Sequence, residues 1–164
     1  MNGPKIIANL DVLKELTRKY PEASDRARVS RTTQVLLLLE RVVKLKTPVG
    51  AGPTHLRDTI FQKVQRGAQA IIGILGTPCA YGEPVEMGTR PHFPPIAPIR
   101  HWVEKKLGIT GKEAGSVAFL IARAISKRGT KGAAMFEEGF GENEADIIRI
   151  LEMIPGDIVK SVNG

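Results

Sequence analysis

The sequence predicts an α+β fold: a small antiparallel β-sheet packed by several α-helices, with an extended proline-rich loop. Apolar residues recur at helical spacing near both ends of the chain. Two short segments rich in β-branched residues lie close together within residues 54–76, which places the sheet there. Five prolines then fall within residues 84–98, and so much proline favours a loop.

The chain of 164 residues has the length of one domain. We divide it into N-terminal helices (9–46), a sheet and loop (47–98) and a helical C-terminal part (99–164). Because aromatic residues make up only 5%, the core is expected to be mostly aliphatic. The single cysteine, Cys79, cannot form an internal disulfide, which fits a reducing compartment. The most apolar run, at 35–39, is too short to cross a bilayer, so we expect no membrane contact.

Two helices are expected in the N-terminal part. The first covers residues 9–20, and Pro21 ends it. Asp25 is a suitable N-cap for a second, longer helix that continues to about Leu45. Apolar residues from Val29 onward form a stripe in that helix, which is typical of packing against a core. The apolar residues at helical spacing in the first helix are Leu10, Leu13, Leu16 and Tyr20.

The sheet is predicted as an antiparallel hairpin. Its strands are LRDTIFQKVQ (56–65) and AQAIIGILGT (68–77), joined near Arg66-Gly67. Alternation with a period of two places every second side chain on one face of a strand. The side chains expected to share a face are Ile60 and Val64 in the first strand, and Ala70, Ile72 and Ile74 in the second.

Three helices are expected after the prolines. The first is IAPIRHWVEKKLG (96–108), whose final glycine is a C-terminal stop. The second begins at Thr110, which has the capping-box spacing with Glu113, and ends at Gly129. The last covers 143–154 and is broken at Pro155-Gly156. In the second of these helices, the residues expected to be buried are Val117, Leu120, Ile121, Ala124 and Ile125.

The net charge of +7 is distributed unevenly. Residues 1–136 hold 22 Lys and Arg against 10 Asp and Glu, a net charge of +12. Residues 137–164 hold 2 against 7, a net charge of −5. A basic body with an acidic end is suited to a polyanion such as DNA, or to a neighbouring copy whose acidic end meets the basic body.

Few residues carry a signal for catalysis. Glu83 and Glu86 are candidates for an acid/base pair, and His92 is a candidate to complete a metal site with them. An acid/base pair needs one carboxyl group with a raised pKa, usually through burial, and the sequence does not indicate burial here. Cys79 is expected to be a small buried apolar residue. We therefore expect no catalytic residue, no metal and no cofactor, and a protein that is not an enzyme.

Nucleic-acid binding is the main alternative, as a basic accessory protein. Arginines from 26 to 31 and the run SKRGTKG (126–132) are suited to contacts with phosphates. Aromatic residues for stacking on single strands are scarce, and no helix-turn-helix spacing stands out. Non-specific proximity to DNA is compatible with this charge pattern.

Three segments together resemble the tail-completion, or head–tail joining, family of long-tailed bacteriophages, which includes the minor tail protein Z type. The first, PVGAGPTHLRDTIFQKV (48–64), is similar to that family's proline-glycine turn, leucine-arginine pair and first strand. The second is ILGTPCAYGEPVEMGTRPHFPP (74–95). The third, IRHWVEKKLGI (99–109) with VAFLIARAISKRGTKGAAMFEEGF (117–140), resembles a longer branch with additional helices. In the second segment, the positions that match the family pattern are Gly76, Thr77, Tyr81, Gly82, Glu86, Gly88 and Thr89.

The resemblance implies a structural virion protein without enzymatic activity. It implies a ring of identical subunits, six in number, around the DNA channel of the phage neck. The ring's partners are the head-completion or connector proteins on one side and the tail terminator or tail-tube proteins on the other. The implied location is the virion, and the host cytoplasm during assembly.

Under this interpretation, the prolines of residues 81–98 stiffen a loop that contacts a neighbouring subunit, because fixed backbone angles lower the entropy lost on binding. The residues expected at a subunit or partner interface are Tyr81, Glu83, Glu86, Arg90, Glu137, Glu138, Glu142 and Glu144. Those expected to face the DNA channel or a partner ring are Arg26, Arg28, Arg31, Lys127, Arg128 and Lys131.

Overall fold

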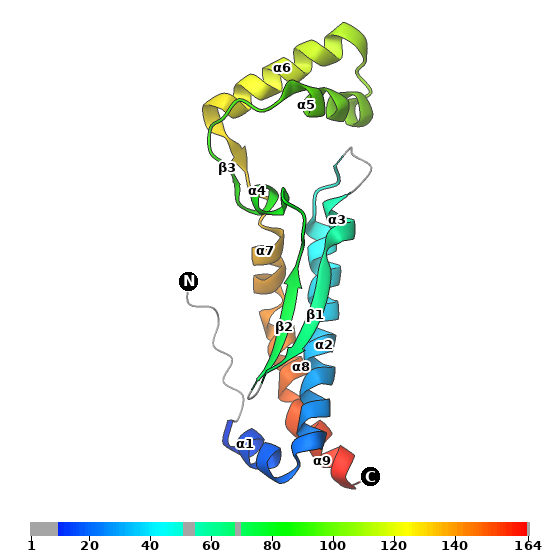
Figure 1. Cartoon of the computed structure of the whole chain (residues 1–164), viewed down its shortest axis with the longest axis vertical. Coiled ribbons are helices and arrows are strands. Elements are labelled where there is room, and N and C mark those ends of the chain that lie inside the picture. Colours follow the sequence, from blue (N-terminus) through cyan, green and yellow to red (C-terminus); the bar gives the residue numbers. More distant parts are fainter. Residues whose placement is uncertain (1–9, 51–54, 68–69, 164) are drawn as a thin grey trace. The chain divides into compact units, whose positions relative to one another are not determined.

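The predicted α+β fold class is confirmed by the computed structural model, which describes residues 10–50, 55–67 and 70–163 (Figure 1). Helices dominate these residues, and their strands pair into two small two-stranded sheets. The chain forms two compact units, and each draws on segments that are distant in sequence. Unit 1 takes the described residues of Met1–Val42, Phe61–Gly76 and Glu138–Gly164, and unit 2 those of Val43–Ile60 and Thr77–Glu137.

Unit 1 is a two-stranded sheet packed on helices. Alanines of α2 and isoleucines of α9 form one buried cluster, and Leu13 and Leu16 of α1 pack against it together with Tyr20, which follows α1. A second cluster joins α2 to α8, and Leu75 of β2 packs against it. The elements are α1 (Leu10–Lys19), α2 (Pro21–Lys46, to Val42 in this unit), β1 (Phe61–Arg66), β2 (Ile71–Gly76), the end of α7 (Met135–Glu142), α8 (Glu144–Glu152) and α9 (Ile154–Asn163).

The long helix α2 begins at Pro21, so the prediction of an N-cap at Asp25 was wrong. Proline is well suited to the first position of a helix, where its missing N–H has no partner to lose. Asp25 lies one turn inside α2, and its carboxylate accepts a hydrogen bond from Arg66 Nε at 3.1 Å. This contact ties the end of β1 to the start of α2.

The sheet of unit 1 is the predicted antiparallel hairpin, with Phe61 paired to Gly76 and Arg66 to Ile71. The expected strand at 56–59 is instead a helical turn, α3 (Leu56–Thr59), and residues 68–69 lie outside the described part. Gly73 faces α2, because a Cβ added there would lie 2.9 Å from Thr32 Cγ2. The inner face of β2 therefore holds its odd-numbered residues, while the even-numbered Ile72 is 49% exposed.

Unit 2 contains a helical hairpin, α5 and α6, joined to the rest of the unit by a two-stranded ribbon (Figure 1). Gly108, with φ 69°, ends the first helix as the sequence predicted. Thr110 precedes α6 as expected, but its side chain makes no capping hydrogen bond. The elements are α3, α4 (Gly82–Met87), β3 (Gly88–Thr89), α5 (Ile96–Trp102), a π-helical turn (Val103–Leu107), α6 (Gly111–Arg128), β4 (Thr130–Lys131) and the start of α7.

The buried face of α6 differs from the predicted one. Small residues line it, since Ala114, Ala118 and Ala122 are 0% exposed. Their spacing of four residues forms one stripe, and α5 packs against α6. Of the expected core residues, Leu120 is 60% exposed, while Val117, Ile121, Ala124 and Ile125 are half-buried. A narrow stripe of alanines lets two helices approach closely, so the fully buried positions of α6 are the small residues.

Two further expectations differ from the structure. The proline-rich loop is not extended throughout, because its first part forms the helix α4. Pro84 lies within the first turn of α4, where a missing N–H costs little. The break expected at Pro155-Gly156 is the first turn of α9, which continues to Asn163.

The ribbon of β3 and β4 depends on glycines. Gly88 has φ 78° and Gly129 has φ 70°, angles that favour glycine. A Cβ at Gly88 would overlap the carbonyl oxygen of Thr130, and one at Gly129 would overlap that of Thr89. The hydroxyls of Thr89 and Thr130 lie 2.9 Å apart and also accept each other's backbone N–H groups. Two Gly-Thr pairs therefore cross in close backbone contact.

Replacing Gly88 by alanine is expected to lower the free energy of unfolding by about 2 to 5 kcal/mol, because backbone strain and steric overlap add. The matched control is Gly115→Ala in α6, where an added Cβ meets nothing within 4 Å. That variant should be neutral or more stable by about 0.5 to 1 kcal/mol. Urea denaturation followed by circular dichroism measures both, and equal effects of the two variants would contradict this view of the ribbon.

Candidate interaction surfaces

The segment from Tyr81 to Thr89 is tied to the segment from Thr130 to Glu137 by a continuous set of hydrogen bonds. The backbone N–H groups of Ala133 and Ala134 donate to the carbonyl oxygens of Val85 and Glu86 at 2.8 and 3.1 Å. The β3–β4 pairing continues the set on one side. These contacts make α4 and the start of α7 one framework.

Glu86 completes this framework with its carboxylate. The N–H of Phe136 donates to both of its oxygens at 3.1 Å, and the N–H of Glu137 donates to Oε1 at 3.1 Å. These groups belong to the first turn of α7, where backbone N–H groups have no partner within the helix. A carboxylate at this position also interacts favourably with the helix dipole. Glu86 thus caps α7, and its carboxylate is not paired with that of Glu83, which is exposed.

The other expected interface residues of this segment lie at the surface. Tyr81 precedes α4 and is 46% exposed. A side-chain hydrogen bond with Cys79, supported by burial, raises the pKa of the Tyr81 hydroxyl above its ordinary value. Arg90 is exposed, and its carbonyl oxygen lies 2.9 Å from His92 Nδ1. Glu83, Tyr81 and Arg90 are therefore accessible along the framework.

The expected acidic residues gather on α7 and at the start of α8. Glu137, Glu138 and Glu142 are exposed, and Glu144 is half-buried. Phe140 of the same helix is two residues from Glu138 and from Glu142, so it lies on the opposite side of α7, where it lines a cavity of unit 1. The carboxylates and the aromatic side chain of α7 thus occupy different sides of the helix.

The expected basic residues fall into two groups in different units. Arg26, Arg28 and Arg31 belong to α2 in unit 1, while Lys127 and Arg128 end α6 in unit 2 and Lys131 lies in β4. Arg26 is exposed. Arg31 is held within its own unit, because its guanidinium donates to both carboxylate oxygens of Asp157, with Nη2 2.9 Å from Oδ1.

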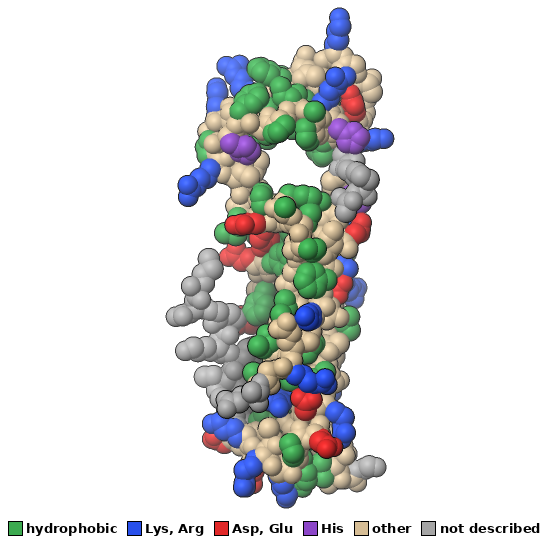
Figure 2. Space-filling model, in the orientation of Figure 1, with side chains coloured by type: hydrophobic (Ala, Val, Ile, Leu, Met, Phe, Trp, Pro, Cys, Tyr) green, Lys and Arg blue, Asp and Glu red, His purple; other side chains and the backbone are tan. Residues whose placement is uncertain are grey.

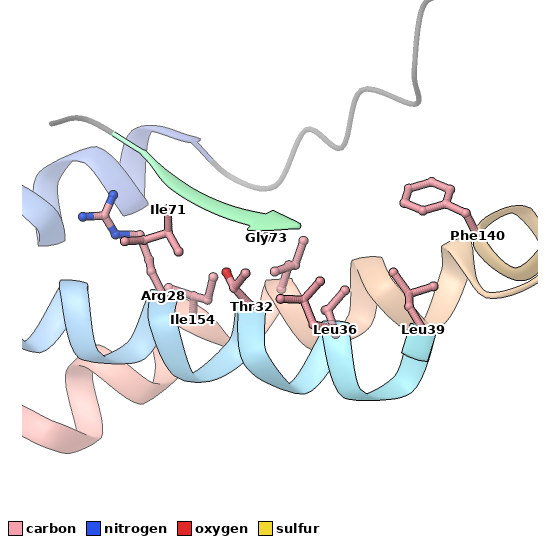
Figure 3. A pocket seen from close by; sticks show the side chains of 10 residues that line it. Arg28, Thr32, Leu36, Leu39, Ile71, Gly73, Phe140 and Ile154 are labelled. Carbon is pink, nitrogen blue, oxygen red and sulfur yellow. The ribbon is translucent and has the colours of Figure 1, made fainter. Parts of the chain in front are cut away.

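Arg28 lies at a cavity of about 350 Å³ in unit 1 (Figure 3). Its Nε is buried and has no hydrogen-bond partner among the described residues. Figure 3 shows side chains of α2 that point toward β2, with Ile154 and Phe140 at the sides. Apart from Arg28 and Thr32, the walls are apolar or glycine: Val35, Leu36, Leu39, Ile71, Gly73, Phe140, Leu151 and Ile154.

The outer face of α6 was not predicted as a surface. Phe119 is 46% and Leu120 60% exposed, and Lys127 and Arg128 line a shallow depression with Arg123 and Leu120. The signal that could have revealed this face is the repeat of alanines at Ala114, Ala118 and Ala122, which indicates close packing on that side. Figure 2 shows hydrophobic side chains gathered over the α5–α6 hairpin with Lys and Arg side chains around them.

Within the described part of the chain, no group of three or more His, Cys, Asp or Glu side chains is arranged to hold a metal ion. The helices there are too short or too polar to span a membrane. Comparisons with protein-family models, curated proteins and solved structures gave no match to this chain.

Replacing Glu86 by alanine is expected to lower the free energy of unfolding by about 0.5 to 2 kcal/mol, the usual cost of losing a helix cap. The amides of Phe136 and Glu137 should also exchange faster with deuterium, because they lose their acceptor. Glu86→Gln keeps one carbonyl oxygen and should be intermediate. Glu83→Ala is the control, with an effect within about 0.5 kcal/mol; similar exchange rates in all variants would rule out the cap.

The Arg31–Asp157 pair predicts a dependence of stability on pH. Hydrogen bonds from Arg31 hold the pKa of the Asp157 carboxyl below its ordinary value, and the charge of Lys160 adds to this. The contribution is therefore present above about pH 4, the usual pKa of an unfolded Asp, and is lost as pH falls further. At pH 7, Asp157→Asn should cost about 1 to 3 kcal/mol.

The measurement is urea denaturation of the wild type and of Asp157→Asn from pH 7 to pH 2.5. Their difference in unfolding free energy should shrink at low pH. Asp11→Asn is the control, because the Asp11 side chain is 96% exposed. A difference that stays constant with pH would show that the ion pair is not the cause.

Proposed function

We propose that this chain is a structural protein of the phage neck, which completes the tail and joins it to a DNA-filled head as one subunit of a ring around the DNA channel. The proposal starts from the resemblance of residues 48–64, 74–95, 99–109 and 117–140 to tail-completion proteins. The ring has six copies in this proposal, and its partners are the connector or head-completion proteins and the tail terminator or tail-tube proteins.

The observation that carries the proposal is the framework formed by α4, β3, β4 and the start of α7. It contains the Glu-x-Gly-Thr motif of the resemblance. In this motif Glu86 caps α7, Gly88 permits the close crossing of the two strands, and the hydroxyl of Thr89 is hydrogen-bonded to that of Thr130. A rigid framework loses little entropy when it binds a partner. Met87, 67% exposed, and the accessible Glu83 and Arg90 give it a surface for protein contacts.

The charge distribution supports a ring of copies. A closed ring of identical subunits needs two different patches on each copy, which meet head to tail. The chain offers an acidic patch on α7 and a basic one on α6. Unlike charges favour the correct encounter and disfavour contact between equal patches.

One observation favours a second function, that of a basic nucleic-acid-binding protein. Arg123, Lys127 and Arg128 are exposed near one another at the end of α6. Such a cluster is suited to phosphate contacts, whose affinity falls steeply as salt concentration rises. Filter binding of a DNA duplex over a salt series measures this, and a steep decrease would favour the second function.

If the neck proposal is right, a stop codon in this gene of the encoding phage should yield DNA-filled heads and separate tails in electron micrographs. Adding the purified protein to an extract of those particles should join them and restore infectivity by several orders of magnitude. Protein carrying Gly88→Ala is the negative control, since its framework is disrupted. Complete particles from the mutated phage would overturn the proposal.

A further inference from the structure

We propose that the hairpin of β1 and β2 joins neighbouring copies of this chain, with the open edge of β2 in one copy pairing antiparallel to the open edge of β1 in the next. The inference deepens the proposed ring, on which it rests, by naming the contact between its subunits. It combines three features of the hairpin: two open strand edges, a β2 strand without charge, and apolar side chains exposed on the face away from α2.

Both outer edges of the hairpin are open. The sheet consists of β1 and β2, which pair from Phe61 with Gly76 to Arg66 with Ile71. Each strand has a partner on one side, and within the described residues neither has another strand on its other side (Figure 1). Because successive backbone N–H and C=O groups point to opposite sides of a strand, half of them in each strand point away from the hairpin. An open edge of this kind is a template for a further strand.

The β2 strand lacks the residues that hinder pairing with another chain. Its sequence, IIGILG, contains no charged residue and no proline. Native proteins protect open edges with lysine, other charged residues or proline. In this hairpin such residues belong to β1, which carries Lys63 and Arg66. Pairing of β1 with β1 would bring basic side chains of two copies together, whereas pairing of β1 with β2 does not.

The outer face of the hairpin, defined as the face away from α2, exposes apolar side chains. Because Gly73 faces α2, the even-numbered residues of β2 and their partners in β1 belong to this outer face. On it Phe61 is 43% and Ile72 49% exposed. Side chains on one face of adjacent strands lie about 5 Å apart, so a neighbouring copy's strand would contact them. Pairing of copies therefore covers apolar surface that a single hairpin leaves in water.

A second copy is the occupant because the hairpin itself supplies both edges that a continuous sheet needs. The two strands have equal length, and their open edges are unlike patches on opposite sides of the hairpin. Joining β2 of one copy to β1 of the next is a head-to-tail contact, and closing the ring leaves no edge open. Rotation about an axis roughly along the strands keeps every new pair antiparallel, like the pair within the hairpin. Pairing of β2 with β2 in a twofold dimer would leave both β1 edges open.

The first experiment is disulfide cross-linking between single-cysteine variants in a Cys79→Ser background, which removes the native thiol. Ile72→Cys marks the outer face of β2. It is mixed in turn with three variants that mark the same face of β1 and together test different registers: Phe61→Cys, Lys63→Cys and Gln65→Cys. One of the mixtures should form disulfide-linked dimers under mild oxidation, because adjacent strands bring the two Cα atoms within the reach of a disulfide.

The controls use the same chemistry without the strand contact. No variant alone should form dimers, because equal positions of neighbouring copies are two strands, or about 10 Å, apart. Ile72→Cys mixed with Leu37→Cys measures dimers formed by random collision, since Leu37 is 55% exposed on α2. The productive mixture should exceed this background at least about tenfold.

The second experiment is sedimentation velocity of Ile72→Lys over a range of protein concentrations. A charge on the open strand should weaken self-association at least about tenfold, because lysine on an edge hinders pairing. The matched control is Leu37→Lys, which makes the same change at an exposed apolar residue of α2 and should stay within about twofold of wild type. Both positions are exposed, so both melting temperatures should stay close to the wild-type value, which separates lost pairing from lost folding.

Several results would overturn the inference. They are mixtures that do not exceed the collision background, equal weakening by Ile72→Lys and Leu37→Lys, or a wild-type chain that stays monomeric throughout. Dimers of Ile72→Cys alone would show twofold pairing of β2 with β2 and would also overturn it. The joining of heads to tails is scored separately. Joining by a protein that forms no strand cross-links overturns this contact and leaves the neck proposal standing, whereas cross-links in a protein that joins nothing support the contact and overturn the neck proposal.

Discussion

The crossing of two Gly-Thr pairs, Gly88-Thr89 and Gly129-Thr130, is the constraint on which the rest of unit 2 depends. Their backbones lie so close that a Cβ on either glycine would overlap a carbonyl oxygen of the other strand. This contact fixes where the α5–α6 hairpin begins and ends. It also places the chain after β4 beside α4, where Val85 and Glu86 accept its N–H groups.

Charged side chains in both units divide into those bound within the fold and those left at the surface. A carboxylate that caps a helix is held in one place, so Glu86 serves the framework while Glu83 stays accessible. In unit 1, Arg31 is likewise bound to Asp157, and Arg26 remains at the surface. Charged residues of one type thus split into those that hold the fold together and those that remain for contacts with other molecules. The second group is accessible to other molecules, while the first holds the surrounding surface in place.

Several elements could be predicted because their signals are local. The apolar spacing of Leu13, Leu16 and Tyr20 defines α1, and glycines at 108 and 129 end helices through a backbone geometry that few other residues adopt. The buried face of β2 could not be predicted, because Ile71, Ile72, Ile74 and Leu75 are all apolar and alternation does not distinguish the two faces. Gly73 determines which face is buried, because its lack of a side chain lets β2 approach Thr32.

The sequence by itself determined the α+β class, the hairpin of β1 and β2, and the positions of most helices, because these depend on neighbours a few residues apart. It could not determine which face of α6 is buried. Both the alanines and the larger apolar residues recur at helical spacing, and only the close approach of α5 selects the alanines. The capping of α7 by Glu86 also depends on tertiary structure. Glu86 lies 50 residues before Phe136 in the chain, so its carboxylate reaches the start of α7 only when the intervening segment has folded.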